Sequence, residues 1–121
     1  MRVTYINLLG HRHPLCFSLA AYEEVLSTFG GMENLYAALT SESLAEIIHG
    51  LDKLLPILMK AGRIYAAEIG EQLPPELKCR PLDVLDASDP MVLGTVISAI
   101  QKGTSRTVET VQKNGEATPG R

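Results

Sequence analysis

The chain has 121 residues, of which 45% are hydrophobic and 5% aromatic, and its formal net charge at pH 7 is −3. This length fits one domain with a modest core, and the hydrophobic content is too high for a disordered chain. The negative charge and the few aromatic residues argue against proteins that bind nucleic acids or anionic membranes. The longest apolar stretch, 54–59, contains Pro56 and is too short to span a bilayer.

The N-terminal third predicts a β-hairpin followed by a helix. β-Branched and aromatic residues concentrate in 2–7, and a second strand-like run, 13–17, follows a turn at Gly10. Two strands alone are marginal in water, so this hairpin must pack on helices. Ser18 is placed to cap the next helix, and Gly30 to end it. Its apolar residues at helical spacing are Leu19, Tyr22, Val25, Leu26 and Phe29.

A short helix over 34–39 and a long helical pattern over 44–69 come next. Ser43 and Glu46 match a capping box, and Gly70 is a stop signal. Apolar residues recur at positions 44, 47, 48, 51, 54, 55, 58, 65 and 69. Pro56 removes one helical hydrogen bond, so either one kinked helix or two helices, ending near Gly50 and starting near Asp52, would fit. We favour a break or strong kink within 50–56.

The C-terminal part predicts two further helical segments. Proline favours a one- or two-turn helix over 81–86, and Asp89 with Pro90 marks the start of another, which Gly103 ends. The core face of that last helix consists of Val92, Leu93, Val96, Ile97 and Ile100. We therefore expect a mainly α (α+β) domain over 1–109, with a short N-terminal hairpin packed on about four to five helices. The polar segment 110–121 is expected to be a disordered tail.

Residues with catalytic or metal-binding chemistry are better explained by structure. His11, His13 and Cys16 are too few for a zinc site, and on a strand Cys16 faces away from the two histidines. Asp83, Asp86 and Asp89 are three acids at a spacing of three, but Asp83 lies in a first helical turn and Asp89 is itself a cap, so capping explains them better than a metal site. The glycine pair Gly30-Gly31 could suggest a phosphate-binding loop. It follows a helix, however, so it cannot aim a helix N-terminus at phosphate. We expect no catalytic, metal or cofactor site and a non-enzymatic protein.

The long helix contains the candidates for partner binding. Ile57, Leu58 and Met59, beside Leu54 and Leu55, make it apolar nearly all round. Such a helix is either central or meets another molecule. In a small domain we interpret these five residues as a surface for a protein partner or a second copy of the chain.

The order of elements resembles that of the tail assembly chaperones of long-tailed bacteriophages. The resemblance covers most of 1–103 and is carried by MRVTYINLLGHRHPLCF, SLAAYEEVLSTFGG, SLAEIIHGLDKLLPILMKAGRIYAAEIG and RPLDVLDASDPMVLGTVISAIQKG. Its most characteristic part is the run from Phe17 to Gly31, with Tyr22-Glu23-Glu24 inside it. Pro56 and the histidine-rich turn depart from the family pattern.

This resemblance implies a non-enzymatic protein of the bacterial host's cytoplasm, where it would coat the tape-measure protein and help tail-tube protein assemble around it. The lack of an apolar signal core before the two cysteines also favours a reducing cytoplasm. The alternatives are a small helical adaptor or regulator of a phage or mobile element, and a metal-dependent protein that uses His11 and His13.

Overall fold

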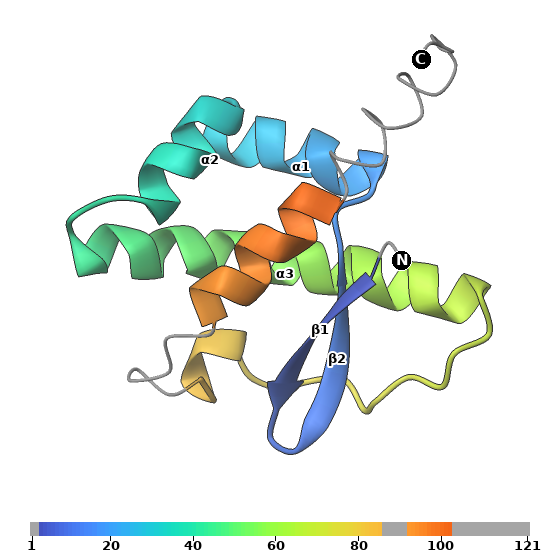
Figure 1. Cartoon of the computed structure of the whole chain (residues 1–121). Helices are drawn as coiled ribbons and strands as arrows, with labels where there is room; N and C mark the ends of the chain where they lie inside the picture. The colour runs from blue at the N-terminus through green and yellow to red at the C-terminus, as the bar shows by residue number, and fades with distance from the viewer. Residues whose placement is uncertain (1–2, 86–91, 103–121) are drawn as a thin grey trace, which may run out of the picture.

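A computed structural model describes residues 3–85 and 92–102 of the chain. It confirms a mostly helical protein with an N-terminal antiparallel hairpin. The described elements are β1 (Val3–Leu8), β2 (His11–Cys16), α1 (Leu19–Phe29), α2 (Met32–Leu39), α3 (Leu44–Glu68), the 3₁₀ turn η1 (Pro81–Asp83) and a helix over 92–102. The long α3 runs through the middle of the molecule (Figure 1).

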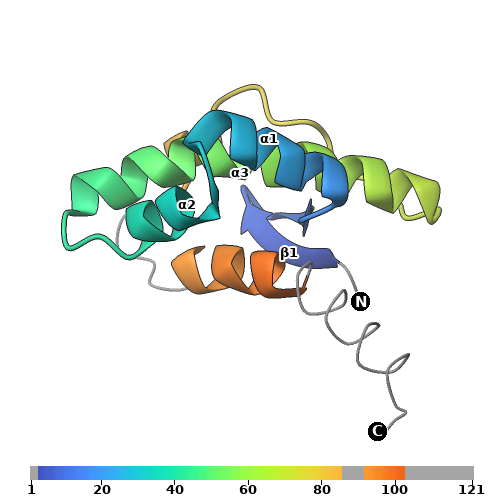
Figure 2. The same ribbon diagram turned by 90° about the horizontal axis from the view of Figure 1, so that it is seen from above.

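The other elements pack around α3. Seen from above, α1 lies over α3, while the 92–102 helix and the hairpin lie along its side (Figure 2). The core contains residues from both strands and all four helices, and its fully enclosed members include Leu15, Val25, Leu35, Leu58 and Val96. None of the described helices is long and apolar enough to cross a membrane.

The hairpin turns at Leu9 and Gly10. Both residues have positive φ angles, 53° and 81°, as a two-residue type I′ turn requires. β1 pairs with β2 so that Tyr5 lies opposite Pro14 and Ile6 opposite His13. The second strand begins at His11, two residues before its predicted start. The turn at Gly10 and the existence of the hairpin are confirmed.

The hairpin meets α3 through a backbone contact between Pro14 and Gly62. In a two-residue hairpin the pair beside the turn is hydrogen-bonded, and the pairs alternate from there. Pro14 and Tyr5 therefore form a non-bonded pair, where the missing proline N–H costs nothing and the Pro14 carbonyl points away from β1. That carbonyl lies against Gly62, and a Cβ atom added there would overlap it and come within 2.9 Å of the Leu15 nitrogen.

The first helix begins and ends as predicted. The Ser18 hydroxyl accepts a hydrogen bond from the Ala21 amide at 3.2 Å, and Gly30 closes the helix with φ of 85°. The buried face differs, because Leu19 is 84% exposed and Leu26 is 42% exposed. Ala21 and Val25 are buried instead. A helical repeat identifies an apolar face, but the direction of the neighbouring elements decides which edge of that face is covered.

The predicted capping box of α3 is half right. The Ser43 hydroxyl accepts from the Glu46 amide at 3.4 Å, as expected. The Glu46 carboxylate does not reach back to the Ser43 amide. It accepts a 2.6 Å bond from the Ser41 hydroxyl, whose oxygen in turn accepts from the Ser43 amide at 3.0 Å. The serine before the cap thus takes over the second half of the box.

A break in α3 within 50–56 is wrong, since one continuous helix passes through Pro56, whereas the strong kink stays a prediction. Proline removes a single amide bond, to the Asp52 carbonyl, and Pro56 itself is exposed. Leu51, Leu55 and Leu58 on either side of it are buried in the same core. Because these leucines pack in one core, both halves of the helix keep the same rotational register. The free energy of this packing outweighs the loss of one hydrogen bond.

The end of α3 agrees with the sequence. Gly70 has φ of 82°, its amide donates to Ala67, and the Glu71 amide donates to Ala66. This pair of bonds is a Schellman motif. The second helix starts two residues earlier than predicted, at Met32. The predicted cap at Asp89 and Pro90, the stop at Gly103 and the tail 110–121 lie outside the described residues.

We predict that Gly62→Ala destabilises the protein by a net amount of about 2 kcal/mol. Forcing a methyl group into the Pro14 carbonyl costs about 3 kcal/mol, and the better helix propensity of alanine returns about 1 kcal/mol. Chemical denaturation measures the difference. Gly94→Ala is the matched control, because nothing lies within 4 Å of a Cβ atom at that helical position, and it should be neutral or slightly stabilising. Equal stability of the two variants would contradict the contact.

Candidate functional site

The five residues proposed as a partner surface all lie in the core. Leu54, Leu55 and Leu58 are fully enclosed, and Ile57 and Met59 are 7% and 9% exposed. α3 is apolar all round at this point because other elements enclose it, which is the first of the two alternatives for such a helix. These residues therefore do not form an exposed surface in this fold, and a partner surface has to lie elsewhere.

Exposed apolar side chains gather where α3 extends past the elements packed on it. A helix of 25 residues is about 37 Å long, and both of its ends project from the body of the molecule (Figure 1). Leu44 and Ile48 are 67% and 45% exposed at one end, and Ile69 is 51% exposed at the other. They continue the core stripe of α3 beyond its cover.

An open groove of about 650 Å³ lies between α1, α2 and the first half of α3. Its residues are Phe29 of α1, Ala37 and Ala38 of α2, and Ala45, Glu46, His49, Gly50 and Lys53 of α3. α2 approaches α3 closely here, since a Cβ atom at Gly50 would lie 3.1 Å from that of Ala38. Small side chains thus form an apolar floor. The polar groups come from α3 and carry both signs of charge.

This groove can receive a helix. Small residues allow a partner backbone to come close, and a concave apolar surface accepts the large side chains on one face of an amphipathic helix. Glu46 and Lys53 line the same groove, so they are placed to pair with charges that flank the apolar face of such a helix.

Sequence reasoning missed the groove. Ala37, Ala38 and Ala45 are ordinary helix-forming residues, and in the sequence Gly50 indicates only a possible helix end. The available signal was the concentration of small residues at 37–38, 45 and 50, which marks close helix approach only once α2 and α3 are known to be neighbours.

Two adjoining cavities, of about 370 and 380 Å³, lie beside His13 on another part of the molecule. The first is formed by β2, the second half of α3, the segment 71–80 and Pro81, and the second by the hairpin and the segment 71–80. The Arg63 guanidinium of α3 donates a 2.9 Å bond to the Pro74 carbonyl and so holds this segment in place. His13 is 1% exposed, and neither ring nitrogen has a hydrogen-bond partner among the described residues.

The charge state of His13 follows from this position. Burial lowers the pKa of His13 below its ordinary value, and the positive charges of Arg63 and His11 lower this pKa further. An uncharged imidazole is therefore the form that the fold accommodates at neutral pH.

The other residues considered for metal binding or catalysis are dispersed or have structural contacts. His11 and Cys79 are exposed and Cys16 is buried. Within 3–85 and 92–102 there is no group of three or more His, Cys, Asp or Glu side chains placed to hold a metal ion. Asp83 caps η1 by accepting from the Arg80 amide at 3.0 Å, as predicted, whereas Asp86 and Asp89 lie outside the described residues.

Comparisons of the chain with protein-family models, with curated proteins and with solved structures found no match.

We predict that the free energy of unfolding falls on acidification because of His13. Above about pH 6.5 the imidazole is neutral in both states. Below this pH the unfolded chain binds a proton that the native state resists, so stability drops by up to about 1.4 kcal/mol per pH unit until the native pKa is reached. Urea denaturation at pH values between about 7 and 5 measures the slope.

His13→Leu should flatten this slope, since leucine fills the buried site and does not titrate. His49→Gln is the control, because His49 is exposed, and it should keep the slope of the parent protein. A parent protein whose stability is constant over this pH range would contradict the assignment.

Proposed function

We propose that the protein is a non-enzymatic tail assembly chaperone of a long-tailed bacteriophage, acting in the cytoplasm of the bacterial host. The groove between α1, α2 and α3 carries this proposal, because it is an open apolar surface of a shape and size suited to a helix. The partner is the tape-measure protein, as the sequence resemblance implies, and tail-tube protein is a second partner.

Such a chaperone must cover apolar stripes of its partner, and the groove is suited to this. A long helical protein exposes apolar stripes that aggregate until they are covered. A groove with a floor of alanine and glycine accepts many different large side chains, since nothing in it selects one shape. Specificity then comes from the charges at its sides, where Glu46 and Lys53 present opposite signs.

The non-enzymatic part of the proposal is supported by the structural roles of two residues from the candidate metal-binding and phosphate-binding motifs. Asp83 caps a 3₁₀ turn, and Gly30 ends a helix in the left-handed conformation. These residues are explained without a reaction. The exposed ends of the α3 stripe, Leu44, Ile48 and Ile69, are surfaces on which a second copy of the chain or tail-tube protein can pack.

We predict that co-expression with its tape-measure protein keeps that protein soluble, and that the two are recovered together. Ala37→Lys and Ala45→Glu fill the groove with charge, and each places its charge at the helix end that favours it. Each variant should reduce the recovered complex about tenfold or more, as expected for the loss of a central contact. Pull-down and the soluble fraction measure this.

Ala67→Lys is the matched control, since it changes an exposed alanine of α3 that lies outside the groove. It should bind like the parent protein. A tape-measure protein that remains insoluble and unbound contradicts the chaperone role. Salt-sensitive DNA binding by the purified chain would instead favour a regulator.

A further inference from the structure

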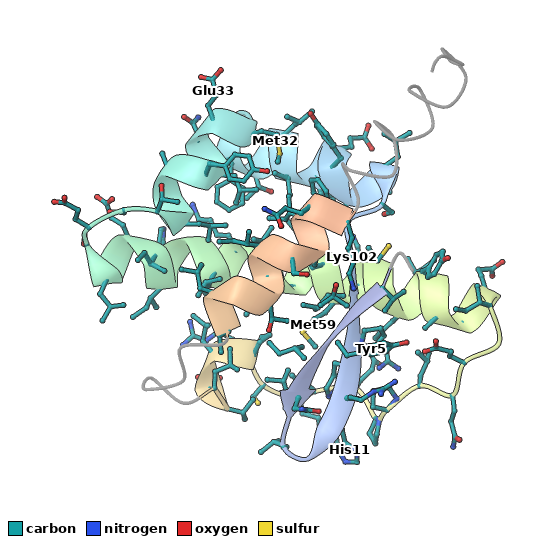
Figure 3. The ribbon with its side chains drawn as sticks, viewed as in Figure 1. Tyr5, His11, Met32, Glu33, Met59 and Lys102 are labelled. Carbon is teal, nitrogen blue, oxygen red and sulfur yellow. The ribbon has the colours of Figure 1, made fainter. Side chains whose placement is uncertain are left out.

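The cavities beside His13 have the features of a small-molecule site that is separate from the groove. Both are lined by His13, Glu76, Leu77 and Cys79, so they share one wall. The first reaches along α3 to Met59, and the second reaches the turn of the hairpin at His11. Met59 and His11 are labelled in Figure 3, where His11 lies at the turn of the hairpin. Neither cavity shares a residue with the groove.

The buried imidazole is the strongest sign of a ligand here. A buried polar group without a partner costs about 1–3 kcal/mol. His13 has two such nitrogens among the described residues, and it lines both cavities. A molecule that accepts a hydrogen bond from this ring would remove part of that cost.

The charges around His13 favour a ligand with one negative charge. α3 contributes Lys60 and Arg63, and Lys60 is already paired with Glu24. The segment 71–80 contributes Lys78 to the second cavity and Glu76 to both cavities, and the remaining titratable groups are Cys79 of this segment and His11 of β2. Together Arg63 and Lys78 exceed the one remaining carboxylate, Glu76, by a single positive charge.

The rest of the lining is apolar. It consists of Pro56, Met59 and Ile64 of α3, together with Leu77, Pro81, Pro75 and Leu9. A bare inorganic ion would leave this surface uncovered, whereas a short alkyl group would cover it.

We propose that the first of these cavities binds a small organic carboxylate, with the carboxylate at His13 and Arg63 and a short apolar group against Ile64 and Leu77. The carboxylate favours the imidazolium form of His13, so binding takes up a proton. Affinity therefore rises as the pH falls toward the ordinary titration range of histidine. This inference is independent of the chaperone function and can hold or fail without it.

Calorimetric titration of the full chain with butyrate tests the proposal. Butyrate should bind about fivefold more tightly near pH 6 than near pH 7.5 because of the linked proton. Repeating the titration in buffers of different ionisation enthalpy measures the proton uptake directly. Butylammonium, which has the same alkyl group and the opposite charge, should not bind detectably.

Arg63→Gln should weaken butyrate binding about tenfold by removing a charge-assisted hydrogen bond. Arg12→Gln is the matched control, since Arg12 lies over the Tyr5 ring at 4.0 Å and outside both cavities, and it should bind like the parent. His13→Leu should abolish the proton uptake. The proposal is overturned if butyrate does not bind, if binding is independent of pH, or if inorganic phosphate binds as tightly as butyrate.

Discussion

The rest of the structure depends on the contact of the Pro14 carbonyl with Gly62. At most strand–helix contacts side chains separate the two backbones, but here the backbones themselves meet. The hairpin is thereby held close to α3, and one face of it, with Leu8, His13 and Leu15, is buried. Proline serves this contact well, because it lacks an N–H that would need a partner and its carbonyl is free to point at the helix.

The position of α3 explains why its most apolar residues are not a binding surface. A central helix in a small domain must be apolar on several sides, so an all-round apolar sequence reflects enclosure. Exposed apolar residues of α3 lie toward its ends, where the covering elements stop. The exposed Leu44 and Ile69 result from a helix that is longer than the body around it, whereas the groove lies where α1 and α2 pack against the first half of α3.

His13 is a polar residue in the core that stabilises the fold less than an apolar residue would. Leucine at this site would pack without unmet hydrogen bonds, whereas the imidazole carries two nitrogens that the described residues leave without partners. The adjoining cavities and the cation of Arg63 give this residue a setting in which a ligand and a proton can bind together. The same features that lower the stability of the protein at acid pH thus create a chemically distinct site.

Structural features that depend on a few residues adjacent in the sequence could be predicted from the sequence. The hairpin with its turn at Gly10, the cap at Ser18 and the stops at Gly30 and Gly70 each follow from local backbone chemistry. Features that depend on distant neighbours could not. Whether α3 continues through Pro56, whether Leu54 to Met59 are covered, and where small residues leave a groove are all decided by packing, whose energy exceeds that of any one local signal. A local pattern states what a segment can form, and its tertiary neighbours decide which of its faces meets solvent.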